Sequence, residues 1–299
     1  MFEIKIPATS ANLGPGFDSL GLALNISNKF IYKENPHFKI NLIDQNGDFI
    51  HIPREENLIY TVFRTVFEMN NQDLPAVEIS AEVNIPFARG MGSSATAILG
   101  GLIGANILLD NIYDKDNLLN LAIDIEGHPD NIVPAFTGGM VINILSNGQL
   151  KYKKVRVSEE LKIIMIIPDF KLSTAKLREL LPEKIMFSDA IFNISRTALL
   201  TSIFYDSDWD LLKVAMEDRL HQDYRSKLIP GFDEVLKTGY DAGALGIALS
   251  GAGPTIITFA LENEKKIAMK MADKFKKYDI DCTYIITKVD NDGTVINKI

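Results

Sequence analysis

The chain of 299 residues has little cysteine and no long apolar run. Its only cysteine, Cys282, cannot form an intrachain disulfide, which fits a reducing compartment. Residues 1–6 lack the apolar stretch of a secretory signal peptide. The longest apolar stretch, around residues 95–109, is too short to cross a membrane. We therefore predict a cytoplasmic protein with no membrane partner.

Positive charge and histidine are also scarce. The 31 lysine and arginine residues are outnumbered by 39 aspartate and glutamate residues, which gives a net charge of −8. An acidic chain is a poor electrostatic match for nucleic acid, so we expect no nucleic-acid partner. Anions can still be bound locally by a few arginines and by helix N-termini. Because His37, His51 and His221 have no metal-ligand neighbours at a useful spacing, we expect no zinc site.

Strand and helix patterns are mixed along the whole chain, without repeats. Alternation or apolar runs predict strands at residues 1–6, 38–42, 77–85, 162–167 and 282–289, and a strand, tight turn and strand at 246–260. Apolar residues at helical spacing predict helices at 57–69, 95–109, 115–125, 190–204, 208–220, 232–242 and 264–278, while 7–19 is predicted as a loop. The polar stretch 148–159 is the best candidate for a domain boundary, and we divide the chain there into domains 1–154 and 155–299.

The most informative segment is the loop at residues 86–96, PFARGMGSSAT, which runs directly into a predicted helix. Gly90 and Gly92 let the backbone come close to a bound group. Ser93 and Ser94 stand where the first free N–H groups of a helix point. This arrangement predicts an anion site of the kind that holds nucleotide phosphates. A capped helix start without a ligand is the alternative, because no lysine of a P-loop follows Gly92 and the glycine spacing is not that of a dinucleotide fingerprint.

Two further small-residue loops lie between predicted elements: PATSANLGPGFD at residues 7–18 and SGAGPT at 250–255. Together with the loop at 86–96, they resemble the GHMP family of small-molecule kinases, although Met91 stands where leucine is usual. The opening loop and the segment EGHPDN at residues 126–131 resemble the homoserine kinase branch of that family in particular. The resemblance extends from residue 6 to at least residue 255, and the opening motif is long and specific.

That resemblance implies an α+β, two-domain GHMP kinase fold. The N-terminal domain would contain a mixed sheet with a left-handed β-α-β unit, the C-terminal domain would be ferredoxin-like, and the active site would lie between them. It implies ATP-dependent phosphorylation of the side-chain hydroxyl of L-homoserine to O-phospho-L-homoserine and ADP, in threonine biosynthesis. ATP and Mg²⁺ are the expected cofactors, and a homodimer is the expected assembly.

The resemblance also assigns the nucleotide and metal sites. Ser94 and Glu126 are expected to hold Mg²⁺, which prefers hard oxygen ligands, and Ser93 is the alternative to Ser94. Some family members place the glutamate further before the histidine, whereas here only Gly127 separates them. Asn57 is expected to contact the nucleotide base, with helix capping as an equal alternative. The residues expected around the phosphates are Pro86, Phe87, Ala88, Arg89, Gly90, Met91, Gly92, Ser93, Ser94, Ala95 and Thr96.

An α-amino acid substrate needs partners for both of its charges. The resemblance assigns its carboxylate to Arg178 and Arg225, since arginine binds carboxylates with two parallel hydrogen bonds. Gln222 and Asp223, just before Arg225, replace the Glu-Pro that is common in the family. Its ammonium and hydroxyl groups are assigned to Asn12 and Asp18, whose alternative roles are turn-forming contacts. His128 is expected to contact the substrate as well.

The catalytic base has two candidates in the 126–131 segment. Asn131 falls near the position where mevalonate kinases carry an aspartate thought to act as the base. An amide cannot accept a proton at neutral pH, so the resemblance implies that alignment and charge stabilisation replace a strong base. Asp130 is the rival candidate. A GHMP kinase for another alcohol, such as a mevalonate-type acid, and a non-catalytic sensor with the same pocket are the alternatives to the function as a whole.

Overall fold

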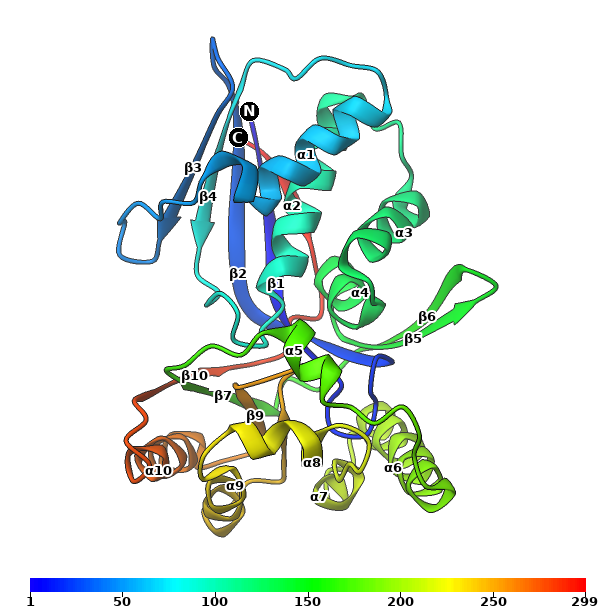
Figure 1. Ribbon diagram of the computed structural model, residues 1–299, viewed down its shortest axis with the longest axis vertical. Coiled ribbons are helices and arrows are strands. Elements are labelled where there is room, and N and C mark those ends of the chain that lie inside the picture. The colour runs from blue at the N-terminus through cyan, green and yellow to red at the C-terminus, as the bar shows by residue number, and fades with distance from the viewer.

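Figure 1 shows the computed structural model, which describes residues 1–299 apart from the side chains of Thr174 and Ala175. One sheet with its helices fills the upper half of the view, and a second sheet with its helices fills the lower half. The first and last strands pair in the upper sheet, with Phe2 opposite Lys298, so the two ends of the chain lie close together. In the described part of the chain, no helix has both the length and the apolar character needed to cross a membrane.

The upper sheet has seven strands and is mixed. Its strand order is β11-β1-β2-β4-β3, and β5 pairs with both β2 and β6. Strands β3 and β4 are parallel and are joined through helix α1 (Leu58–Met69), whereas the other pairs are antiparallel. The handedness of this β3–α1–β4 unit stays a prediction. The strands are β1 (Phe2–Ala11), β2 (Leu20–Glu34), β3 (Lys39–Asp44), β4 (Val77–Val83), β5 (Met140–Ser146), β6 (Gln149–Val155) and β11 (Val295–Lys298).

Helices of the N-terminal half pack against this sheet because their apolar residues and those of the strands form one core. Helix α2 is buried over most of its length, between α1, α3 and β1. Helix α4 packs against β1 and β2 near the middle of the molecule (Figure 1), and the 126–131 segment forms the junction between α3 and α4. The elements are η1 (Arg54–Glu56), α1 (Leu58–Met69), α2 (Ser93–Leu108), α3 (Lys115–Glu126) and α4 (Pro129–Thr137).

The lower sheet is antiparallel, with the order β10-β7-β9-β8. Taken in chain order this is 4-1-3-2, the ferredoxin-like arrangement that was predicted. Helices α9 and α10 pack on one face of the sheet. The elements are β7 (Lys162–Pro168), α5 (Thr174–Glu179), α6 (Phe187–Asp206), α7 (Leu212–Ala215), α8 (Gln222–Arg225), η2 (Ser226–Leu228), α9 (Phe232–Asp241), β8 (Gly246–Leu249), β9 (Ile256–Ala260), α10 (Glu264–Lys276) and β10 (Cys282–Thr287).

The opposite face of the lower sheet shares a core with the N-terminal half. Leu13, Leu22 and Met91 from the upper half pack in the same buried cluster as Met165 and Phe259 from the lower sheet. Each fully buried side chain of this size contributes roughly 1.5–3 kcal/mol. The loops that carry the predicted site are therefore held between the two halves by apolar packing on both sides.

The structure corrects two of the predicted elements and adds elements that were not predicted. Strand β1 continues to Ala11, so residues 7–11 are strand rather than loop. No element was predicted for residues 20–34, which form β2, the longest strand. The helix predicted at 208–220 is reduced to the single turn Leu212–Ala215. The domain boundary at 154/155 stays a prediction: the sheets change between β6 and β7, yet β11 returns to the first sheet.

Candidate functional site

A cavity of about 430 Å³ lies where the two halves meet. It is lined by the opening loop, the glycine loop, the α3–α4 junction, α5, α8 and the turn at 251–252. The predicted residues that line it are Asn12, Asp18, Asn57, Phe87, Ala88, Arg89, Gly90, Met91, Gly92, Ser93, Ser94, Glu126, His128, Asn131, Arg178 and Arg225. Pro86, Ala95 and Thr96 belong to the same segment but do not line the cavity.

The glycine loop needs its two glycines for backbone reasons. Gly90 and Gly92 have φ values of 78° and 68°, in the left-handed region that side chains disfavour. A Cβ atom on Gly90 would overlap the carbonyl oxygen of Ser250, and one on Gly92 would overlap the hydroxyl of Thr9. The loop is therefore pressed against strand β1 and against the turn that follows β8.

Helix α2 begins directly after this loop, with Gly92 at its N-cap position. Gly92 has no side chain to cap the helix, so the first-turn N–H groups, from Ser93 onward, are free for another acceptor. An anion at this point would also meet the positive end of the helix dipole. The geometry fits the predicted phosphate site. The Thr96 hydroxyl, by contrast, is already engaged by internal hydrogen bonds. It accepts from the Asn28 amide at 2.9 Å and donates to the Ser93 carbonyl at 2.9 Å.

Arg89 ties the glycine loop to the lower half. Its guanidinium forms an ion pair with the Asp169 carboxylate at 2.6 Å, just after β7. The Arg89 side chain is only 12% exposed, whereas that of Asp169 is 71% exposed. An ion pair with one exposed partner contributes about 0–1 kcal/mol, and this one joins the glycine loop to the residue after β7.

Asn57 acts as a helix cap. Its side-chain oxygen accepts hydrogen bonds from the backbone N–H groups of Ile59 at 3.1 Å and Tyr60 at 3.4 Å, at the start of α1. The capping alternative is thus present in the structure. Because Asn57 also lines the cavity, its contact with a nucleotide base stays a prediction.

The two expected metal ligands meet in the structure. The Ser94 hydroxyl donates to Oε1 of Glu126 at 2.6 Å, across the start of α2 and the end of α3. Burial raises the pKa of Glu126, and the hydrogen bond from Ser94 opposes that rise. A hydroxyl and a carboxylate side by side are the hard oxygen ligands that Mg²⁺ takes, usually few from the protein and the rest from phosphates and water. No group of three or more His, Cys, Asp or Glu among the described residues could hold a metal.

The turn after Glu126 forms a second polar cluster. Nδ1 of His128 lies 2.6 Å from Oδ1 of Asp130, which is almost fully buried. Burial opposes a charged His128, but the hydrogen bond and negative charge of Asp130 outweigh it and raise the pKa of His128. The Asn131 side-chain oxygen accepts from the Thr9 hydroxyl at 2.8 Å. Asp130 is thus bound to His128, while Asn131 is fixed at the edge of the cavity.

Asp18 and Arg178, both predicted to bind substrate, bind each other. Two hydrogen bonds of 2.8 and 2.9 Å join the Arg178 guanidinium to the two carboxylate oxygens of Asp18. Asn12 holds the loop beneath them, since its oxygen accepts from the Asp18 N–H at 3.0 Å and its amide donates to the Gly251 carbonyl at 3.0 Å. The turn-forming alternative for Asn12 is therefore present as well.

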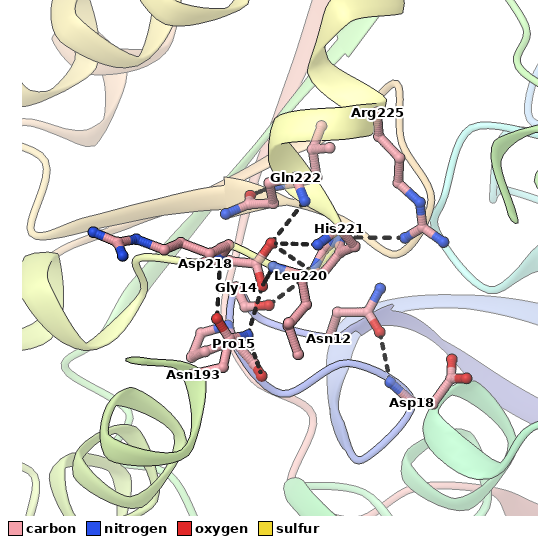
Figure 2. A network of polar contacts seen from close by, with 12 residues as sticks. Asn12, Gly14, Pro15, Asp18, Asn193, Asp218, Leu220, His221, Gln222 and Arg225 are labelled. Carbon is pink, nitrogen blue, oxygen red and sulfur yellow. Dashed lines mark hydrogen bonds and ion pairs between the residues drawn. The ribbon is translucent and has the colours of Figure 1, made fainter. Parts of the chain in front are cut away.

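Arg225 lies next to this loop in a dense polar network, shown in Figure 2. The network joins α8 to residues 12–18 through His221 and Asp218. The sequence analysis did not single out Asp218, and it considered His221 only as a metal ligand. The available signal was its position four residues before Arg225, which places the two side chains on one side of a helical turn.

Comparisons with known proteins identify the family of this chain. Models of the GHMP kinase N-terminal and C-terminal domains match residues 57–139 and 197–277. The crystal structure of a homoserine kinase from Cytophaga hutchinsonii superposes with a TM-score of 0.85 at 29% identity, covering 99% of this chain and 96% of that one. A mevalonate kinase from Methanococcus jannaschii has the same fold, with a TM-score of 0.68 at 16% identity over 97% of this chain and 98% of that one. The chain thus has the fold of the GHMP class of small-molecule kinases.

Among curated relatives, the homoserine kinase of Halothermothrix orenii is 54% identical over 99% of this chain and 96% of its own length. The homoserine kinase of Clostridium botulinum (strain Alaska E43) is 43% identical over 100% of this chain and 99% of its own length. The chain belongs to the homoserine kinase family. This confirms the resemblance drawn from the three loops and the 126–131 segment.

Proposed function

We propose that this chain transfers the γ-phosphoryl group of ATP to the side-chain hydroxyl of L-homoserine, giving O-phospho-L-homoserine and ADP, a step of threonine synthesis. One observation carries the proposal: a single cavity joins a helix N-terminus suited to phosphates with a carboxylate and two arginines suited to an amino acid. The full-length similarity to proteins named homoserine kinase supports the same acceptor.

In the nucleotide half, the backbone N–H groups of the glycine loop and of the first turn of α2 would bind the phosphates of ATP. Ser94 and Glu126 would hold Mg²⁺, which when bound neutralises charge on the β- and γ-phosphates. The raised pKa of Glu126, caused by burial, means that this carboxylate gains from a nearby cation. Asn57 would contact the base in addition to capping α1.

In the acceptor half, Arg178 and Arg225 would bind the substrate carboxylate, and Asp18 the ammonium group. Asn12 would keep Asp18 in place, and the second lone pair of its side-chain oxygen would accept a hydrogen bond from the substrate. His128, whose charged form is favoured by Asp130, would contact the substrate. Asn131 would orient the hydroxyl without removing its proton, so that alignment and phosphate charge stabilisation supply the rate enhancement.

Three broader proposals rest on the family and on composition: that the enzyme uses Mg²⁺, that it works as a homodimer, and that it is cytoplasmic. Sedimentation equilibrium of the purified chain tests the second. A mass of one subunit at micromolar concentration would contradict it.

The central experiment is a coupled assay of ADP release with ATP, Mg²⁺ and four acceptors: L-homoserine, mevalonate, L-serine and galactose. We expect kcat/KM to be highest for L-homoserine. A higher kcat/KM for any of the other three would identify that compound as the acceptor in place of L-homoserine. Absence of turnover with all four, in protein that still binds ATP, would favour the sensor alternative.

A further inference from the structure

Arg225 is buried without a carboxylate partner in its hydrogen bonds. It is 2% exposed, and its Nη1 donates to two neutral acceptors, Nδ1 of His221 and the carbonyl of Gly251, each at 3.3 Å. Its Nε has no hydrogen-bond partner among the described residues. A buried charge is costly unless something compensates for it. Because Arg225 also lines the cavity, an anionic ligand there is the partner that would compensate.

His221 lies behind Arg225 and is completely buried. Its Nε2 lies 2.8 Å from the carbonyl oxygen of Gly14, an atom that can only accept, so Nε2 carries the hydrogen. Its Nδ1 faces the Arg225 guanidinium, which can only donate, so Nδ1 accepts. Burial lowers the pKa of His221, which favours this neutral form. The ring thus joins the arginine on one side to the opening loop on the other.

Asp218 lies beside His221, to its left in Figure 2, and holds the backbone that carries the ring. Its Oδ2 accepts from the backbone N–H groups of His221 at 2.9 Å and Gln222 at 2.7 Å, at the start of α8. Its Oδ1 accepts from the Asn193 amide at 2.7 Å, and Asn193 donates also to the Pro15 carbonyl at 3.2 Å. The short helix that carries Arg225 is therefore held to α6 and to the loop that carries Asn12 and Asp18.

We propose that His221 is a positioning residue for the acceptor site: Nδ1 of its ring fixes the place of the Arg225 guanidinium and so sets the affinity for the substrate carboxylate. This inference rests on the proposed function only in that the acceptor must carry a carboxylate. His221 itself does not touch the reacting atoms.

Two replacements separate the contact of Nδ1 from those of Nε2, which lies 2.8 Å from the Gly14 carbonyl oxygen and 3.6 Å from Oδ2 of Asp218. Asparagine places a polar atom near the position of Nδ1, and glutamine places one near the position of Nε2. His221→Asn can therefore still accept from Arg225, whereas His221→Gln can still donate to Gly14. We expect His221→Gln to raise the KM for L-homoserine at least about tenfold, as loss of one hydrogen bond to a charged group would. We expect His221→Asn to change it less than about threefold, and both to leave the KM for ATP unchanged.

A folding defect cannot imitate this result, because a smaller active fraction lowers the apparent kcat and leaves KM unchanged. The matched controls are His37→Asn and His37→Gln, at an exposed histidine outside the cavity, which should leave both KM values unchanged. A substrate control is 3-amino-1-propanol, which is L-homoserine without its carboxylate. The glutamine variant should use it as well as the wild type does.

The opposite order of the two variants would overturn the proposal and assign the effect to the Gly14 contact. Unchanged homoserine KM in both, or equal changes for homoserine and ATP, would also overturn it. If neither variant folds, Asp218→Asn provides the same test, with a raised homoserine KM and an unchanged ATP KM expected. The variants are assayed with the acceptor that the wild type uses best. If that acceptor is not L-homoserine, the proposed function is refuted while this inference can still be tested. If that acceptor has no carboxylate, this inference is refuted.

Discussion

The ion pair between Asp18 and Arg178 predicts how the enzyme selects a zwitterion. Its side chains are 33% and 45% exposed, so the pair contributes only about 0–1 kcal/mol and opens easily. L-homoserine can replace both halves, with its carboxylate on Arg178 and its ammonium on Asp18. An acceptor with a carboxylate alone, such as 4-hydroxybutyrate, would take Arg178 and leave Asp18 without a cation. Asp18→Asn removes the charge that makes this distinction.

The size of the effect follows from the lost contact. A hydrogen bond between charged groups contributes about 1.5–3 kcal/mol, which corresponds to about ten- to a hundredfold in kcat/KM. We expect Asp18→Asn to lower kcat/KM for L-homoserine by that factor and to leave the value for 4-hydroxybutyrate unchanged or higher. Asparagine suits the position because the φ of Asp18 is 53°, a left-handed value that asparagine tolerates.

The assay is ADP release with each acceptor, for the wild type and for two variants. The second variant, Asp279→Asn, is the matched control, because Asp279 has a φ of 57° and is exposed. It does not line the cavity. The reasoning fails if the ratio of the two kcat/KM values is the same in Asp18→Asn as in the wild type. It also fails if both acceptors lose activity equally, since Asp18 would then act on something other than the ammonium.

Three further predictions follow from the site. Glu126→Gln keeps the shape of the side chain but loses its charge, so the Mg²⁺ concentration for half-maximal activity should rise about tenfold or more; an unchanged Mg²⁺ titration would remove Glu126 as a ligand. The pKa of His128 is raised above its ordinary 6.5, so the folded protein binds the proton more tightly. The free energy of unfolding, measured in urea, should fall as the pH rises from about 6.5 through the folded pKa, and His128→Asn should flatten that fall; equal slopes would contradict the assignment. Gly92→Ala should lower the free energy of unfolding by about 1–3 kcal/mol through its left-handed φ and the overlap with a threonine hydroxyl. Gly127→Ala is the control, because Gly127 has a φ of 91° and nothing lies within 4 Å of the added carbon, so this variant shows the effect of φ alone. Equal losses of unfolding free energy in the two variants would exclude a contribution from the overlap with the Thr9 hydroxyl.

Features that depend on a few neighbouring residues were predictable. The glycine loop at residues 86–96 was recognisable because a close backbone approach requires glycine, and Gly90 and Gly92 do have left-handed φ values and close neighbours. Helix α1 was predicted from residue spacing, and its cap at Asn57 is visible in the structure. The ferredoxin-like order of the lower sheet was expected from the family, and the four strands follow it.

Features that depend on distant packing were not predictable from local patterns. Strand β2 was missed, since its residues 20–24 are buried throughout and do not alternate. The helix predicted at 208–220 is interrupted because Asp218 turns its carboxylate onto the backbone N–H groups of residues 220–222 rather than continuing the helix. In both cases tertiary contacts prevail over a weak local preference.

By itself, the sequence determined which chemical groups the molecule has and predicted which loop binds phosphate, because glycine, serine and helix-start patterns act over a few residues. Only the tertiary structure decided which of those groups meet. Asp18 and Arg178 are 160 positions apart in the chain and share two hydrogen bonds, and Ser94 reaches Glu126 across 32 positions. His221 looked like an isolated histidine until packing placed it between Arg225 and Gly14. Side-chain chemistry is local, whereas the distance between two side chains is set by how apolar surfaces pack over the whole chain.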